Sequence, residues 1–102
     1  MHLIVKEKLD VLKSLCKYFR IKRMYVFGSA STGQMKEESD IDLLISFEDG
    51  LSIEEYTENY FSLQYRLREL FKRNVDIVTE SSLSNPFFIQ GVNQTKELIY
   101  GI

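Results

Sequence analysis

Three aspartates on two apolar segments are the residues of this chain whose types and spacing most directly suggest chemistry. Asp40 and Asp42 stand two positions apart around the start of the apolar segment 41–47, and Asp76 lies inside the segment 75–78. Because successive side chains of a strand point to opposite faces, burying the apolar side chains of the first segment turns both of its aspartates toward solvent. If the two strands are neighbours, the three carboxylates converge on one patch of the sheet.

Carboxylates this close to one another repel, and without a cation at least one of their pKa values would rise. Mg²⁺ removes the conflict because it prefers oxygen ligands and completes its shell with water and substrate phosphates. Two such ions, roughly 3.5–4 Å apart, can stabilise both the attacking and the leaving oxygen in phosphoryl-type transfer. The aspartates therefore indicate a site for two metal ions and a triphosphate.

A Gly-Ser pair, Gly28 and Ser29, follows the apolar segment 24–27 and supplies the other half of such a site. Glycine has no Cβ, so the backbone can approach a ligand closely and can adopt unusual dihedral angles. The residues that follow, 29–33, read as a short turn or helix start, whose free N–H groups attract phosphate oxygens. This segment is not a P-loop, since the chain has no G-x-x-x-x-G-K-[ST] pattern.

In this order and spacing, the residues resemble the nucleotidyltransferase superfamily of the DNA polymerase β type, and most of all its minimal nucleotidyltransferases (MNT). The resemblance covers nearly the whole chain. It implies that Gly28 and Ser29 contact the nucleotide phosphates. It further implies that Asp40 and Asp42 bind the metal ions, and that Asp76 completes one metal site and helps to activate the acceptor hydroxyl. By this resemblance the three aspartates are both the catalytic residues and the ligands of two Mg²⁺ ions.

One position departs from the pattern of that family. Many minimal members carry an arginine before the next glycine of this loop, and here the corresponding position is Thr32. An arginine offers a fixed fork of donors to phosphate oxygens, which threonine does not. Lys36 lies nearby and would compensate as a point charge, so we expect Thr32 and Lys36 to belong to the nucleotide-binding part of the site.

The resemblance also suggests a partner, because minimal nucleotidyltransferases are often encoded beside a helical HEPN-domain protein. The expected activity is transfer of a nucleoside monophosphate, with ATP as the expected donor, to a hydroxyl of that partner, within a toxin–antitoxin pair. One alternative is a subunit that keeps the fold and only binds its partner. Another is an enzyme that modifies a small molecule such as an aminoglycoside, which the lack of an extra substrate-holding domain makes a weaker interpretation.

Composition agrees with one α/β domain spanning residues 1–102. The chain is 44% hydrophobic and 27% charged, as in ordinary globular proteins. A net charge of −2 argues against a general nucleic-acid binder. We expect a cytoplasmic protein, because there is no apolar run of roughly 20 residues, no signal-peptide pattern and one cysteine, which cannot form an intrachain disulfide. The sequence leaves open whether the chain forms a homo-oligomer.

The remaining patterns predict a two-layer α/β (α+β) sandwich, in which helices pack on one face of a small mixed sheet of three or more strands. Apolar residues recur at helical spacing over about 3–19, 53–73 and 86–99. Ser52 and Glu55 form a predicted capping box before the long central helix. The expected order is helix, strand, strand, helix, strand, helix.

Other residues have a simpler structural interpretation. Cys16 lies on the apolar stripe of the first helix, which is typical of a buried thiol, and His2 has no second histidine or cysteine nearby to share a zinc ion. Phe61 and Tyr65 flank the main stripe of the long helix, where they either pack inside or face a partner. The last part of that helix is basic, with Arg66, Arg68, Lys72 and Arg73. These residues favour either a solvated face or an acidic partner. The aspartates themselves could be polar residues of turns and strand edges, although aspartate is disfavoured in strands.

Overall fold

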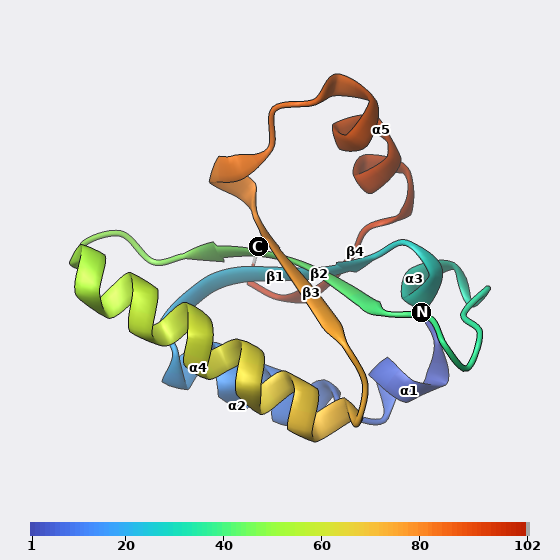
Figure 1. Cartoon of the computed structure of the whole chain (residues 1–102), viewed down its shortest axis with the longest axis horizontal. Helices are drawn as coiled ribbons and strands as arrows, with labels where there is room; N and C mark the ends of the chain where they lie inside the picture. The colour runs from blue at the N-terminus through green and yellow to red at the C-terminus, as the bar shows by residue number, and fades with distance from the viewer. Residues whose placement is uncertain (102) are drawn as a thin grey trace.

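Four strands form one mixed sheet in the computed structural model, which describes residues 1–101 (Figure 1). The strands follow the order β3-β2-β1-β4; β1 is antiparallel to both of its neighbours and β2 is parallel to β3. Their bounds are Ile21–Phe27 for β1, Ile41–Phe47 for β2, Val75–Thr79 for β3 and Glu97–Tyr100 for β4. The two strands expected to carry aspartates are therefore neighbours in the sheet.

Five α-helices and one 3-10 turn connect the strands within residues 1–101. They are α1 (Leu3–Lys6), α2 (Leu9–Tyr18), α3 (Ser29–Thr32), α4 (Ile53–Phe71), η1 (Glu80–Ser82) and α5 (Pro86–Thr95). The predicted capping box starts α4: Ser52 Oγ accepts from the Glu55 N–H at 3.1 Å, and the Glu55 carboxylate accepts from the Ser52 N–H at 3.4 Å. In this described part of the chain, no helix combines the length and the apolar character that a membrane crossing needs.

The main hydrophobic core lies between the sheet and the pair α2 and α4, below the sheet in Figure 1. On β2 the alternation is as predicted, because Ile41, Leu43 and Ile45 are all fully buried on this face. From α4, Leu63 and Leu67 are also fully buried against them. Removing apolar surface from water is worth roughly 25 cal/mol per Å², so this face holds the fold together.

Cys16 belongs to this core, as its place on the apolar stripe predicts. Its side chain is fully buried, and its thiol lies 3.7 Å from the sulfur of Met24. Burial raises the pKa of the Cys16 thiol to about 12. The sulfur therefore stays protonated at neutral pH and packs as an apolar group rather than acting as a nucleophile.

The opposite face of the sheet is covered in part by α5, which corrects the expectation that the helices pack on one face. Phe27, Leu44 and Val92 form a second, smaller cluster there. The ring of Phe27 also meets that of Phe88 of α5 edge to face, with the ring centres 6.0 Å apart. Figure 1 shows α5 above the sheet and α2 and α4 below it. Of the apolar residues predicted to pack the last helix, Phe88 and Val92 do so, but against the other face.

The end of the chain differs from the predicted helix over 86–99. The helix stops at Thr95, and Leu98 and Ile99 belong to β4, which pairs with β1 through partners such as Tyr25 and Leu98. A short apolar run is compatible with either a helix or a strand, and here the unpaired edge of β1 decides in favour of the strand. The sheet therefore has one strand more than the three that the sequence identified.

Two further boundaries differ from the sequence prediction. The first helix, predicted over about 3–19, is divided into α1 and α2, and nothing in the sequence of residues 7–8 explains the break. Strand β1 begins at Ile21 rather than at Met24. The consecutive basic residues Lys22 and Arg23 hid this start, because a register irregularity between Ile21 and Arg23 breaks the alternation of the strand there.

Candidate active site

Asp42 and Asp76 face each other across the parallel pair β2 and β3, where they are partners in the strand register. On the other side of β2, Asp42 is opposite Phe27, the last residue of β1 before Gly28. Asp40 precedes β2 by one residue. The sheet therefore brings the aspartates and the Gly-Ser pair together at one end. Asp42 lies between the buried Ile41 and Leu43 and so faces the side that α2 and α4 leave free, as the alternation predicts.

Asp42 is the carboxyl group most affected by this arrangement. Burial is the main cause that raises its pKa to about 6, and repulsion from the carboxylates of Asp76 and Asp40 adds to it. Asp42 is half-buried, whereas Asp40 and Asp76 are exposed. One carboxyl group thus has a raised pKa, as the sequence suggests, but burial of Asp42 contributes more to it than the repulsion expected from the sequence.

Gly28 is required at its position for two independent reasons. Its backbone has φ +69°, a left-handed conformation that side chains other than glycine rarely adopt. A Cβ added there would also lie 2.8 Å from Oδ2 of Asp42, closer than such atoms approach. The glycine therefore allows the turn and the carboxylate to stand against each other. The Gly28 N–H donates to the hydroxyl of Thr95 at 3.0 Å.

Helix α3 follows the glycine and confirms the short helical turn predicted over 29–33. Ser31 is buried, and its hydroxyl donates to the backbone carbonyl of Thr95 and to the Glu97 carboxylate, the latter at 3.1 Å. The turn is thereby fastened to the junction of α5 and β4. Sequence analysis missed Ser31, Thr95 and Glu97, because nothing in the local sequence around them indicates contacts across more than 60 residues.

The two residues expected to bind phosphate lie outside this cluster of contacts. Thr32 is exposed, and its hydroxyl donates to the carbonyl of Ser29 at 3.5 Å, within its own helix. Lys36 is exposed in the loop between α3 and β2, where its backbone N–H donates to the hydroxyl of Ser39 at 2.9 Å. No ion pair within residues 1–101 joins Lys36 to an aspartate. Their part in nucleotide binding stays a prediction.

The donor set at this end of the sheet fits Mg²⁺ that is shared with a phosphate ligand. Among residues 1–101, no group of three or more His, Cys, Asp and Glu side chains forms a ready arrangement for a metal ion. Asp42 and Asp76 nevertheless offer neighbouring carboxylates, and a cation would relieve their repulsion, which adds to the effect of burial on the pKa of Asp42. Mg²⁺ usually takes one or two carboxylates and completes its shell with water and substrate phosphates.

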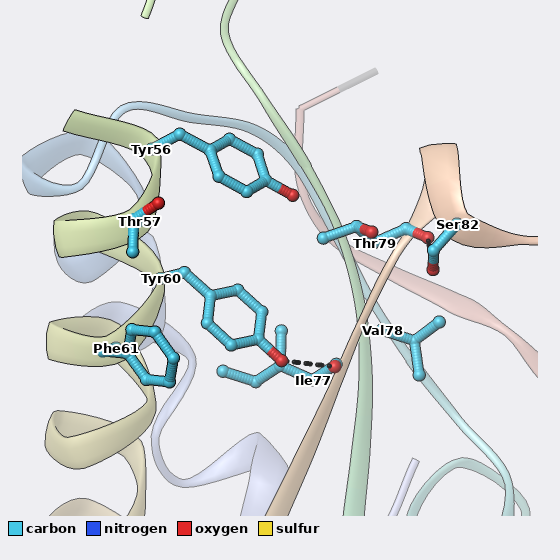
Figure 2. A pocket seen from close by; sticks show the side chains of 8 residues that line it. All are labelled: Tyr56, Thr57, Tyr60, Phe61, Ile77, Val78, Thr79 and Ser82. Atoms are coloured by element: carbon cyan, nitrogen blue, oxygen red, sulfur yellow. Dashed lines mark hydrogen bonds between the residues drawn. The ribbon is translucent and has the colours of Figure 1, made fainter. Parts of the chain in front are cut away.

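A separate hollow of about 390 Å³ lies between α4 and the open edge of β3 (Figure 2). Tyr60 points across it and donates its hydroxyl to the carbonyl of Ile77 at 3.2 Å. The residues that line the hollow are Tyr56, Thr57, Tyr60, Phe61, Ile77, Val78, Thr79 and Ser82. None of these side chains is ionised, so the hollow is unsuited to a triphosphate. The hollow is therefore distinct from the carboxylate site, although both use β3.

Phe61 and Tyr65 do not pack inside, which resolves one of the alternatives left by the sequence. Their exposed fractions are 62% and 65%. With the exposed Tyr18 they line one hollow of about 480 Å³, and such a surface does not by itself identify a partner. A partner at this edge of α4 stays a prediction.

Comparison with known proteins places this geometry in context. The nucleotidyltransferase domain family matches residues 8–98. Protein adenylyltransferase MntA of Thermococcus cleftensis is 34% identical over 90 residues, which are 86% of this chain and 82% of that protein. A solved structure assigned as a minimal nucleotidyltransferase is 32% identical, with a TM-score of 0.76 and 95% of each chain covered. A chain in the complex of the tri-AMPylated Shewanella oneidensis HEPN toxin with its MNT antitoxin has the same fold, with 21% identity, a TM-score of 0.66, and 95% of this chain and 72% of that chain covered.

Proposed function

Because the chain belongs to the family of nucleotidyltransferase domains, we propose that it transfers AMP from ATP to a hydroxyl group of a partner protein in a Mg²⁺-dependent reaction. The observation that carries this proposal is the pairing of Asp42 with Asp76 in the sheet register, beside the Gly28 turn. The name of the Thermococcus cleftensis relative supports AMP as the group transferred.

The three aspartates divide metal binding and proton transfer between them in the proposed reaction. Asp40 and Asp42 would hold the Mg²⁺ ions, which supply positive charge to the phosphates when they are bound. Asp76 would complete one metal site and accept the proton of the acceptor hydroxyl. The hydroxyl oxygen then forms a bond to the α-phosphorus, the bond from that phosphorus to the bridging oxygen breaks, and pyrophosphate leaves. Positioning and charge neutralisation supply most of the rate in such transfers.

The turn after β1 would hold the leaving phosphates. Gly28 lets the backbone pass close to Asp42, and Ser29 offers a hydroxyl at the start of α3. The Gly28 N–H donates to the hydroxyl of Thr95, and the Ser31 hydroxyl donates to the backbone carbonyl of Thr95. These two hydrogen bonds hold the turn rigidly before a ligand arrives. A rigid turn loses little conformational entropy on binding, which favours affinity.

A HEPN-type helical protein is the partner that the comparisons favour, with this chain as the antitoxin of a toxin–antitoxin pair. The support is the fold shared with a chain of the Shewanella oneidensis complex, in which the HEPN toxin carries AMP groups. On this account the partner supplies the acceptor hydroxyl and also completes the surface around the carboxylates.

Transfer of label from [α-³²P]ATP to a HEPN-type partner tests this proposal. We expect Mg²⁺-dependent labelling of the partner by the wild type and a loss of about a hundredfold to a thousandfold with Asp42→Asn, because one ligand of the ions is removed. Asp49→Asn is the matched control, since Asp49 is an exposed aspartate in the turn after β2. Equal labelling by wild type and Asp42→Asn, with both proteins folded by circular dichroism, would contradict the proposal.

Thr32 favours a second candidate, a subunit that keeps the fold and binds its partner without catalysis. The fork of donors that arginine would offer to phosphate is absent at this position, and the Thr32 hydroxyl is bonded to its own helix. On this alternative the wild type labels nothing, yet it binds and neutralises its partner, and Asp40→Asn binds the partner equally well. Binding measured alongside labelling separates the two functions.

A further inference from the structure

Arg73 reaches from the junction of α4 and β3 to the loop that carries Asp40. Its Nη1 donates to the backbone carbonyl of Ser39 at 3.0 Å, and the carbonyl of Lys36 lies 3.5 Å from the same atom. Ser39 immediately precedes Asp40. The guanidinium therefore holds the peptide group through which the chain enters Asp40.

The other side of Asp40 is held from the same junction. The N–H of Ile41, the next residue, donates to the backbone carbonyl of Asn74 at 3.1 Å. Asp40 is thus flanked by two hydrogen bonds, to the adjacent residues Arg73 and Asn74. The same segment continues into β3, so one short piece of chain carries Asp76 and is hydrogen-bonded to both neighbours of Asp40.

The direction of this junction is set by the end of α4. Lys72 has φ +56°, a left-handed conformation that ends the helix, and its N–H donates to the carbonyl of Arg68 at 2.9 Å. The chain therefore leaves the helix axis one residue before Arg73 and turns into β3. This turn leaves the half-buried Arg73 side chain against the loop and not along the helix surface.

The contact acts through the backbone and not through charge. No ion pair joins Arg73 to Asp40 in the part of the chain that the structure describes. The loop forms a turn of its own, in which the Ser39 N–H donates to the carbonyl of Lys36 at 3.0 Å. That turn shapes the loop and Met35 packs the start of the loop against the main core, while Arg73 holds the part that leads into Asp40.

We propose that Arg73 is a positioning residue, which fixes the backbone of Asp40 relative to Asp76 and so sets the spacing of the carboxylates in the nucleotide site. The inference rests on the proposed function. The sequence alone favours a solvated basic face or an acidic partner for Arg73. Arg68 and Arg73 line the same hollow of about 400 Å³ beside Asp40, but the hydrogen bond to the Ser39 carbonyl comes from Arg73.

Arg68→Ala is the matched control for Arg73→Ala, because it removes the same charge from the same hollow while the bond to Ser39 remains. Two quantities are measured: amide hydrogen exchange over residues 36–41 in the metal-free protein, and the affinity for AMP-PNP with Mg²⁺ or with EDTA. For Arg73→Ala we expect about tenfold faster exchange and about tenfold weaker binding with Mg²⁺. Binding in EDTA should stay at the wild-type level. For Arg73→Lys, which keeps the charge, the exchange rate and the affinity with Mg²⁺ should lie between those of the wild type and Arg73→Ala.

Each other outcome overturns the inference in a distinguishable way. Wild-type exchange and binding in Arg73→Ala would show that the contact positions nothing, and the proposed function would stand. Equal weakening by Arg68→Ala, or weaker binding in EDTA, would show that Arg73 acts by its charge on the phosphates. If Arg73→Ala does not fold, the same exchange and binding measurements on Arg73→Lys decide the question. A wild type that does not bind AMP-PNP with Mg²⁺ would overturn the proposed function and this inference together.

Discussion

The two faces of the sheet divide stability and chemistry between them. On one face, β2 gives three fully buried apolar side chains to the core under α2 and α4. On the other face, the same strand presents Asp42, which is half-buried beside Asp76. Burial, together with repulsion from the neighbouring carboxylates, raises the pKa of Asp42. Because neighbouring residues of one strand serve opposite faces, the core fixes the strand register that the carboxylates need. Substitutions one residue apart should therefore have opposite consequences.

Leu43→Ala should give the largest effect on stability. Leu43 is fully buried in the main core, so truncation leaves a cavity and should lower the free energy of unfolding by about 3 kcal/mol. Chemical denaturation measures this loss. The control is Ile53→Ala, since the Ile53 side chain is 86% exposed and its removal should cost well under ~1 kcal/mol. Similar losses for the two variants would contradict the division between the faces.

Gly28→Ala should damage the site more than the fold. The new Cβ would approach Oδ2 of Asp42 at 2.8 Å from a backbone at φ +69°, so either the turn or the carboxylate must move. We expect a loss of about 1–2 kcal/mol of stability and at least about tenfold weaker binding of AMP-PNP with Mg²⁺. Gly33→Ala is the comparison, because Gly33 also has a positive φ but no atom within 4 Å of the added Cβ. Gly33 is in the αL region whereas Gly28 has ψ −147°, so Gly33→Ala should cost less stability and leave binding unchanged. Equal loss of binding would refute the steric explanation.

Asp42→Asn should stabilise the metal-free protein above pH 6. The pKa of Asp42 is raised in the folded state from 3.8 to about 6, so the folded state holds this proton more tightly than the unfolded chain does. The wild-type free energy of unfolding therefore falls, through this group, as the pH rises from about 4 to about 6, and Asp42→Asn lacks that fall. Since the group is only half-buried, we expect a gain on the order of 1 kcal/mol at pH 8.

Denaturation of Asp42→Asn and wild type at pH 4 and pH 8 measures this difference. Asp49→Asn, in the exposed turn after β2, should follow the wild type at both pH values. A gain for Asp42→Asn that is the same at both pH values would show that the ionised carboxylate is not its cause.

Tyr60→Phe should have the smallest effect and extends the comparison to the edge of the sheet. The substitution removes the hydrogen bond to the Ile77 carbonyl, which lies on the open edge of β3, and should cost about 0.5–1 kcal/mol of stability. Transfer activity should be unchanged, because the hollow is distinct from the carboxylates. Tyr65→Phe, at a side chain that is 65% exposed, is the control and should be neutral. Loss of transfer activity in Tyr60→Phe would contradict this separation and show that the hollow belongs to the active site.

Sequence analysis identified the aspartates because their geometry follows from the alternation of one strand. Once Ile41 and Leu43 are buried, Asp42 has to lie on the other face, and parallel pairing with β3 brings in Asp76. The identity of the crowded carboxyl group could not be predicted, since it depends on how far each side chain is buried. The strand over 97–100 was missed because a four-residue apolar run has no period that separates strand from helix.

The supporting contacts of the site were hidden for a different reason. Thr95 holds the Gly28 turn and Arg73 holds the loop before Asp40, and both act over sequence separations of more than 30 residues. Single sequences carry no signal for such pairs. Basic residues at the end of a helix look alike in sequence. The left-handed conformation of Lys72 ends the helix between Arg68 and Arg73, so that Arg68 lies on α4 and Arg73 lies beyond it.

Calorimetric titration of ATP with and without Mg²⁺, on wild type and on the double variant Asp40→Asn/Asp42→Asn, tests the central claim most directly. We predict binding that depends on Mg²⁺ in the wild type and is lost in the folded double variant, because the carboxylates hold the ions that hold the triphosphate. Binding of equal affinity in both proteins, or no binding by a folded wild type, would contradict the assignment of this end of the sheet as a nucleotide site.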